Sequence, residues 1–211
     1  GGAEIHTYYV VKELAKRNKV VLISEGKDPF QTQGRFTHLN IKPKSIPLLS
    51  SISFILRSLI SLFSKVRRIN VLHAQGALSS TIVGLLAKKI SKASLIITCH
   101  GSEVRLQKSM FIRALQRLAF SSADRITTVS LEMKDILVSR YQVKPSKVCV
   151  VRNGYDEVLV RKEKLRNGKK AYVGKYVVYV GRLSYPKDPM TLLHAFKQVY
   201  KVIPDTYLYF I

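Results

Sequence analysis

Residues 176–196 read YVVYVGRLSYPKDPMTLLHAF, and this stretch decides the fold class of the chain. A β-branched and aromatic run stops at Gly181, two cations follow on a short loop at Arg182 and Lys187, and an amphipathic segment then begins. This order predicts a strand, a turn and a helix. Free N–H groups and the helix dipole make a helix N-terminus positive, so cations beside it favour an anion. We therefore expect this loop to bind a phosphate or diphosphate.

The same alternation of short apolar runs and helical segments extends over most of the chain. The expected strands are 19–24, 37–42, 70–74, 94–98, 124–129, 147–151 and 206–211, and the expected helices are 3–17, 46–66, 78–90, 109–120 and 131–139. Such alternation is typical of βαβ units and a parallel sheet. Strands this uniformly apolar are expected to be covered on both faces. The sequence thus predicts an α/β fold, a Rossmann-like doubly wound parallel sheet with ligands at the carboxyl ends of its strands.

The chain is expected to hold one domain and part of another. Residues 1–154 carry most of the βα units, and a new unit starts at residue 176. Residues 155–175 are highly charged and lack hydrophobic periodicity, which favours a linker. Residues 176–211 would then be only the start of a second Rossmann-like domain. Because the sequence does not begin with Met and stops inside the apolar run 206–211, we expect a chain truncated at both ends.

The charge of the chain is extreme for a protein that binds small molecules. Its 211 residues include 36 Lys and Arg against 13 Asp and Glu, a formal net charge of +23. Such a surface attracts nucleic acid, anionic lipid headgroups or phosphorylated substrates, unless an acidic segment elsewhere balances it. Helix-turn-helix, RRM and KH patterns are missing from the sequence, which disfavours nucleic acid. We therefore expect a phosphorylated ligand or an anionic membrane surface as the partner.

The two cysteines and the apolar helix bear on the cellular location. Cys99 and Cys149 have no CxxC or Cys/His spacing, so we expect buried free thiols in a reducing cytoplasm and no metal site. Segment 46–66 is about long enough to span a bilayer. Arg57 at its middle and its recurring serines favour a helix that packs on the sheet or lies at a membrane interface. Together with the charge, this segment suggests a peripheral position on the inner, cytoplasmic face of a membrane.

Two positions at predicted element ends could carry chemistry. His100 follows strand 94–98 directly, where a parallel sheet opens to its ligands. Its imidazole could bind a sugar hydroxyl or transfer a proton, or it could be an ordinary loop histidine. His73 ends the preceding strand in a similar place. The pair Gly1-Gly2 before helix 3–17 could cradle a phosphate with backbone N–H groups, or could simply form a turn.

Four stretches, taken in order, resemble one known family. They are GGAEIHT at 1–7, TCHGSE at 98–103, TVS at 128–130 continued by RNGYD at 152–156, and GRLSYPKDP at 181–189. The chain resembles the retaining GT-B glycosyltransferases called glycosyl transferases group 1, or family 4. The resemblance implies two Rossmann-like domains that face each other across a cleft. The first domain would carry the acceptor and the second the nucleotide-sugar donor.

The resemblance also implies roles for residues at the donor diphosphate. Arg182 and Lys187, on the turn that Gly181 begins, would bind the diphosphate and offset the charge that grows on the leaving nucleotide. That is electrostatic stabilisation of the transition state without a metal or other cofactor. The backbone amides of Gly1 and Gly2 would approach the same diphosphate from the first domain. The co-substrate would be a nucleotide-diphosphate sugar.

By the same resemblance, His100 would lie near the transferred sugar as a third catalytic residue. The enzyme would be a hexosyltransferase that moves a sugar to a hydroxyl of a sugar, lipid-linked or envelope-glycan acceptor, with retention of configuration.

The chain departs from the family pattern at both ends. The family has a strand before the Gly-Gly loop and further βα units in its second domain, which include two glutamates with seven residues between them. An alternative is therefore a truncated, non-catalytic remnant that binds anions or a partner. A basic nucleic-acid-binding α/β protein is a third hypothesis, which rests on charge alone.

Overall fold

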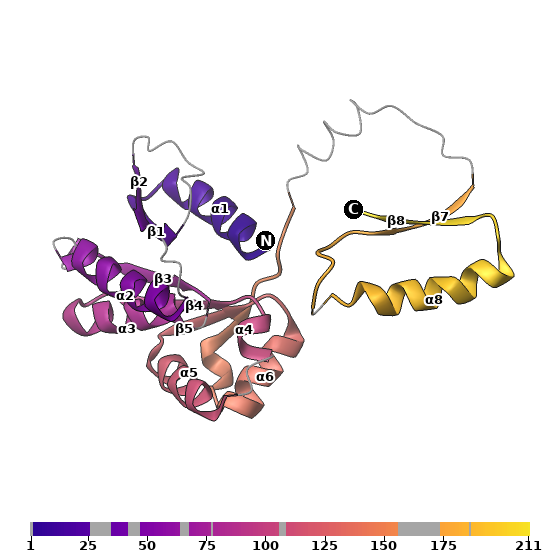
Figure 1. Ribbon diagram of the computed structural model, residues 1–211. Coiled ribbons are helices and arrows are strands. Elements are labelled where there is room, and N and C mark those ends of the chain that lie inside the picture. Colours follow the sequence, from indigo (N-terminus) through magenta and orange to yellow (C-terminus); the bar gives the residue numbers. More distant parts are fainter. Residues whose placement is uncertain are drawn as a thin grey trace. The chain divides into compact units, whose positions relative to one another are not determined.

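The protein is described by a computed structural model that places residues 2–25, 35–41, 47–63, 68–76, 78–105, 109–155, 174–185 and 187–211. The chain divides into two compact units, Gly1–Gly154 and Tyr155–Ile211 (Figure 1). Of the expected linker, residues 156–173 lie outside the described residues. Every strand pair in both units is parallel, so the α/β class and the parallel sheet predicted from the sequence are confirmed.

The first unit alternates strands and helices as predicted. Its described elements, in chain order, are α1 (Gly2–Ala15), β1 (Val20–Glu25), β2 (Phe36–Ile41), α2 (Pro47–Phe63), β3 (Val71–Gln75), α3 (Ser79–Ile90), β4 (Ser94–Cys99), α4 (Ser102–Arg105), α5 (Met110–Ser122), β5 (Arg125–Thr128), α6 (Leu131–Tyr141), a 3-10 turn (Pro145–Lys147) and β6 (Val148–Val150). The strands form a β1-β2 pair and a four-stranded sheet in the order β3-β4-β5-β6. Because this order follows the chain, right-handed connections place α3, α5 and α6 along one face of the sheet, and α2 lies beside α3 (Figure 1).

The core lies between β4 and the helices of that face. Leu95, Ile97 and Cys99 alternate along β4 and are fully buried. The backbone of α3 comes very close at Gly84, where an added Cβ would stand 2.7 Å from Cδ1 of Leu95. Burying each large aliphatic side chain contributes about 1.5–3 kcal/mol, so this dense layer holds α3 on the sheet.

The expectation of two buried free thiols is confirmed for Cys99 and wrong for Cys149, which is free but exposed. Cys99 is buried, and burial raises the pKa of its thiol far above the ordinary range. Cys149 is exposed, because β6 pairs only with β5 among the described strands and Cys149 alternates away from the core side of Val148.

Local capping sets several helix ends. The Ser109 hydroxyl accepts a hydrogen bond from the backbone N–H of Ile112, which makes Ser109 the N-cap and starts α5 at Met110.

Two helices differ from those expected. The four-residue helix α4 was not expected. Of the expected helix 46–66, the structure shows residues 47–63, and the remainder lies outside the described residues. No helix among the described residues is long and apolar enough to cross a membrane.

The second unit contains β7 (Lys175–Tyr179), α8 (Pro189–Val202) and β8 (Thr206–Phe210), with β7 and β8 paired in parallel. This is the strand, turn and helix predicted from residues 176–196, followed by the next strand. Val177 and Val178 remain 40% and 45% exposed. The expected cover on both strand faces is therefore missing from the described part of this unit, which supplies one helix to two strands.

Candidate functional site

Polar side chains gather at the carboxyl ends of three neighbouring strands of the first unit. The strand register aligns Gln75 of β3 with Thr98 of β4, and Thr98 with Thr127 of β5. Because side chains alternate along a strand, these residues and His73 lie on the sheet face opposite the α3 side. A Rossmann-like sheet binds its ligands at this edge.

A continuous line of hydrogen bonds joins these residues to His100. Thr127 and Thr98 hydroxyls are 2.6 Å apart, and Thr98 Oγ1 lies 2.7 Å from His73 Nε2. Gln75 then bridges two rings, with its Nε2 at 3.2 Å from His73 Nε2 and its Oε1 at 2.9 Å from His100 Nε2. Two glycines with positive φ, Gly76 and Gly101, turn the chain sharply just after β3 and after His100.

The chemistry of the Gln75 amide assigns each ring its protonation. The amide nitrogen can only donate, so His73 Nε2 must accept, and neutral His73 carries its proton on Nδ1. The amide oxygen can only accept, so His100 Nε2 must be the protonated nitrogen. Gln75 thereby selects opposite tautomers in the two histidines that it joins.

The surroundings of both rings favour their neutral forms. Burial lowers the pKa of His73, and the neighbouring His6 and His100 rings lower it further. Burial also lowers the pKa of His100, against an opposing effect of the Glu103 carboxylate. A protonated His73 would point its Nε2–H at the N–H of the Gln75 amide, so the neutral form fits the hydrogen-bond line.

His100 is held from three sides. Besides Gln75, Glu103 Oε1 accepts a hydrogen bond of 2.6 Å from the His100 backbone N–H, which is a structural role for this glutamate. The His6 ring on α1 stands edge-on, with ring centroids 5.2 Å apart. Nδ1 of His100 is buried and accepts no hydrogen bond from the described residues. It is the acceptor nitrogen that the network leaves unused.

The Gly-Gly pair is only partly described. Gly1 lies outside the described residues, and Gly2 is the first residue of α1. A Cβ at Gly2 would meet nothing within 4 Å, so local packing does not require glycine there. His6 brings the same helix to the carboxyl-end cluster through its contact with His100.

In the second unit, the loop from β7 to α8 carries the predicted cations. Gly181 N–H donates to Ile211 O over 3.2 Å, which ties the start of the loop to the end of β8. Tyr179 Oη donates to the carbonyl of Arg182 over 3.0 Å. The side chains of Arg182 and Lys187 are exposed and make no hydrogen bond or ion pair with the described residues. Both cations are thus available to a ligand.

The N-terminus of α8 is already occupied, which changes how this loop would bind an anion. Asp188 caps the helix: its carboxylate accepts from the Thr191 backbone N–H at 3.3 Å and from the Thr191 hydroxyl at 2.7 Å. These hydrogen bonds lower the pKa of Asp188. With a carboxylate at the cap and Pro189 lacking an N–H, the groups left to bind an anion would be the two cations rather than the helix terminus.

Sequence reasoning found His73, His100 and both loop cations, and it missed the residues that connect the cluster. Gln75 directly follows the predicted strand 70–74 and is the last residue of the observed β3, so the strand-end rule that selected His73 also selects this position. His6 and Thr98 stand in the stretches 1–7 and 98–103 but were given no role, and Thr127 carries no pattern of its own. Across the described ranges, no group of three His, Cys, Asp or Glu is arranged to hold a metal ion.

The parallel α/β units, with polar groups at strand carboxyl ends, define a Rossmann-like ligand-binding protein. The family comparison is more specific: the sequence matches Glycosyltransferase Family 4 over residues 1–158. The chain therefore belongs to glycosyltransferase family 4, and the GT-B relationship expected from its motifs is confirmed. Comparison with curated protein sequences finds no match.

Solved structures share the fold. HepE from Anabaena in complex with UDP has a TM-score of 0.64 and 14% identity, over 100% of this chain and 66% of that chain. A glycosyltransferase from Rickettsia africae has a TM-score of 0.59 and 18% identity, over 94% of this chain and 54% of that chain. UDP-N-acetylglucosamine 2-epimerase from Rickettsia bellii has a TM-score of 0.61 and 13% identity, over 97% of this chain and 58% of that chain. The chain thus spans between 54% and 66% of the length of these proteins, and at such identities the likeness concerns the fold.

Proposed function

We propose that this chain is the acceptor-side domain and the start of the donor-side domain of a retaining glycosyltransferase. The observation that carries the proposal is the free pair Arg182 and Lys187 at a strand carboxyl end, in a chain of family 4. In the reaction, an acceptor hydroxyl oxygen bonds to the anomeric carbon of the donor sugar, and the bond from that carbon to the diphosphate breaks. The nucleoside diphosphate leaves, the hydroxyl loses its proton, and the anomeric configuration is retained.

Arg182 and Lys187 would bind the diphosphate and stabilise its growing negative charge. A single preorganised group of this kind changes the rate by about 10²–10³-fold. Gly181 would allow the chain to turn toward the phosphates, and the backbone N–H groups of Gly1 and Gly2 would add further donors. Two cations can supply the charge that a divalent metal would otherwise supply, so we expect activity without a metal or other cofactor.

His100 would contact the transferred sugar, a hexose. Its Nε2 is held by Gln75, so the nitrogen that can accept from a sugar hydroxyl is Nδ1. Because Nδ1 is buried and the His6 ring packs against the His100 ring, a ligand would reach Nδ1 only after a local rearrangement. Gln75 acts through His100 and is a positioning residue in this proposal.

The donor is expected to be a nucleoside-diphosphate sugar. HepE from Anabaena was solved with UDP and with UDP-glucose, which supports a uridine donor as the first to test. For the acceptor, we propose a hydroxyl of a lipid-linked sugar or envelope glycan reached from the cytoplasmic side.

Calorimetric titration of the 211-residue chain with UDP, GDP and ADP, in buffer containing EDTA, tests the donor site. Arg182→Ala/Lys187→Ala should weaken diphosphate binding at least about tenfold, since a hydrogen bond to a charged group contributes about 1.5–3 kcal/mol. Lys197→Ala/Lys201→Ala, on the body of α8, removes the same charge and is the matched control. Equal affinities of the two double variants, or nucleotide binding by neither of them nor the unsubstituted chain, would refute the donor site.

Transfer itself needs a separate assay. The chain is incubated with UDP-hexose and a lipid-linked sugar acceptor, and NMR of the product reads the anomeric configuration. An inverted product would remove the retaining assignment even where nucleotide binding is intact.

A further inference from the structure

Helix α2 presents an apolar stripe to solvent. Leu49, Ile52, Leu56, Ile60 and Phe63 follow one another at intervals of three or four residues and therefore share one face of the helix. They are 49%, 46%, 56%, 74% and 75% exposed. We call these five residues the α2 stripe. The stripe is an outer face of a packed helix, because Ser58 and Leu62 on the other side of α2 are buried.

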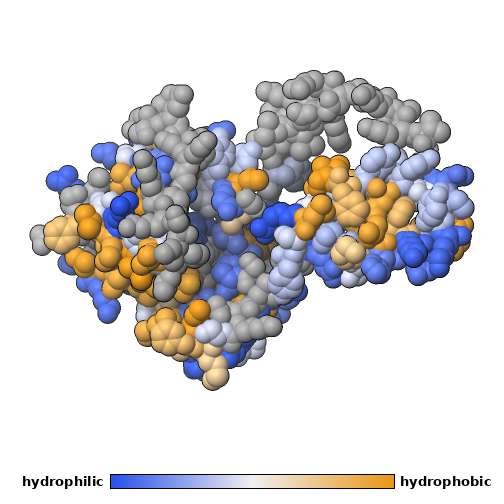
Figure 2. Space-filling view, in the orientation of Figure 1, coloured by the Kyte–Doolittle hydropathy of each residue, from blue (hydrophilic) through white to orange (hydrophobic). Residues whose placement is uncertain are grey.

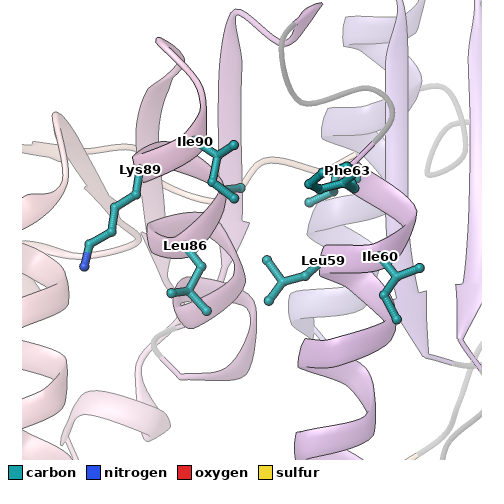
Figure 3. A pocket seen from close by; sticks show the side chains of 8 residues that line it. Leu59, Ile60, Phe63, Leu86, Lys89 and Ile90 are labelled. Carbon is teal, nitrogen blue, oxygen red and sulfur yellow. The ribbon is translucent and has the colours of Figure 1, made fainter.

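A groove between α2 and α3 extends this apolar surface. It encloses a cavity of about 560 Å³. In Figure 3, the Leu59 and Leu86 side chains face each other across the gap, and Phe63 and Ile90 stand at its rim. Lys89 lines the groove with its methylene stem and extends its ammonium away from it, the arrangement of a cation beside an apolar phase. Figure 2 shows hydrophobic residues gathered over α2 and α3.

The chain segment that carries the stripe has charge of one sign, and the carboxylate beside it comes from β1, where Glu25 Oε1 accepts a 3.1 Å hydrogen bond from the Ser50 hydroxyl of α2. Between Asp28 and Glu103 the sequence has no acidic residue and ten Lys or Arg. Arg57 and Lys89 are exposed on α2 and α3 themselves, and Arg68 and Lys92 are exposed just beyond the ends of these helices. Lys88 is the exception, since its ammonium lies 2.6 Å from Asp124 Oδ2. An apolar stripe is thus set within a purely cationic segment.

We propose that the α2 stripe inserts into the interface of an anionic lipid bilayer, with α2 lying in the plane of the membrane. An amphipathic helix with cations beside its apolar face is the arrangement that binds such an interface. Each Lys or Arg near an anionic surface strengthens the attraction, and salt screens it. A second copy of the chain is a poorer occupant, because it would bring two cationic segments together. A nucleic acid would match the charge and leave the stripe in water.

Co-sedimentation of the chain with vesicles tests the proposal without donor or acceptor, so its result is independent of the transfer reaction. Vesicles of phosphatidylcholine alone are compared with vesicles that also contain phosphatidylglycerol. The protein should sediment with the anionic vesicles and much less with the neutral ones, and added salt should release it. Equal binding to both vesicle types would overturn the proposal.

Variants of matched exposure assign the binding surface. Leu56→Ser/Phe63→Ser should reduce vesicle binding about tenfold or more, because two inserted apolar side chains are lost. Leu131→Ser is the control: this leucine, on α6 at the far end of the helix row, is 59% exposed against 56% for Leu56. Circular dichroism checks that both proteins are folded. Equal losses in the two proteins, or a dimer in solution that breaks up in the stripe variant, would assign the stripe to another role.

Discussion

Gln75 offers the sharpest test of the carboxyl-end cluster, because its amide fixes the tautomer of His100. The change is Gln75→Leu, which shortens the side chain by one carbon and removes both polar atoms. The hydrogen bonds at 2.9 Å to His100 Nε2 and at 3.2 Å to His73 Nε2 are lost. A hydrogen bond of this kind contributes about 0.5–1.5 kcal/mol. Losing about 1 kcal/mol should change the ratio of His100 tautomers about fivefold toward the Nδ1-protonated form.

A second substitution at the same position tests the sign of the effect. Gln75→Glu places a carboxylate beside His100 Nε2, which favours the imidazolium and should raise the pKa of His100. Glu103 on α4 already acts in this direction, while burial and the His6 ring of α1 act against it. Gln75→Leu should therefore change the tautomer ratio of His100, and Gln75→Glu should change its pKa.

Ring ¹⁵N NMR measures both quantities, and the chain has only five histidines to assign. A His100→Gln variant identifies the signal. The reasoning would be wrong if His100 kept the same tautomer in Gln75→Leu and the same pKa in Gln75→Glu. In the full enzyme, kcat/KM should fall in Gln75→Leu in step with the population of the Nε2-protonated tautomer, by at most about fivefold.

Three further predictions concern stability. Gly84→Ala should destabilise the first unit by about 1–2 kcal/mol in chemical denaturation, since the added Cβ meets buried Leu95 and overpacking outweighs the gain in helix propensity. Tyr141→Phe should cost about 1–3 kcal/mol, because buried Gln116 Oε1 loses the hydroxyl that lies 3.0 Å away. The melting temperature should fall as the pH drops below about 6.5. The pKa of His73 is lower in the folded chain than in the unfolded chain, so in this range the unfolded chain binds a proton at His73 more readily and is stabilised by it. This fall should be smaller in His73→Asn.

Matched substitutions serve as controls for the first two. A Cβ at Gly154 meets nothing within 4 Å, so Gly154→Ala should leave stability within about 0.5 kcal/mol. Tyr185 is 78% exposed, so Tyr185→Phe should be equally neutral. An unchanged denaturation midpoint in Gly84→Ala, or equal midpoints for the two tyrosine variants, would contradict the packing argument. A melting temperature independent of pH in this window would contradict the assignment of His73 as a neutral ring.

Much of the fold could be predicted from periodicity, because the strands and the longer helices of the first unit carry their own patterns and their own ends. The exposed Cys149 was missed because burial of a strand residue depends on which neighbours the strand has. The short helix α4 lacks the length that periodicity needs. The loop cations were found by position, whereas the capping of α8 by Asp188 depends on a side-chain conformation that spacing does not report.

The His100 cluster shows where local reasoning stops. Gln75, Thr98 and Thr127 come from three strands and meet only because the register aligns them. A slip of one residue would turn each of these side chains to the other face of the sheet. The register is set in turn by the buried residues one position away, Ala74 opposite Ile97 and Ile97 opposite Ile126. The apolar face of the sheet thus fixes the polar face, so a substitution that shifts the core packing of β4 should also disturb the tautomer of His100.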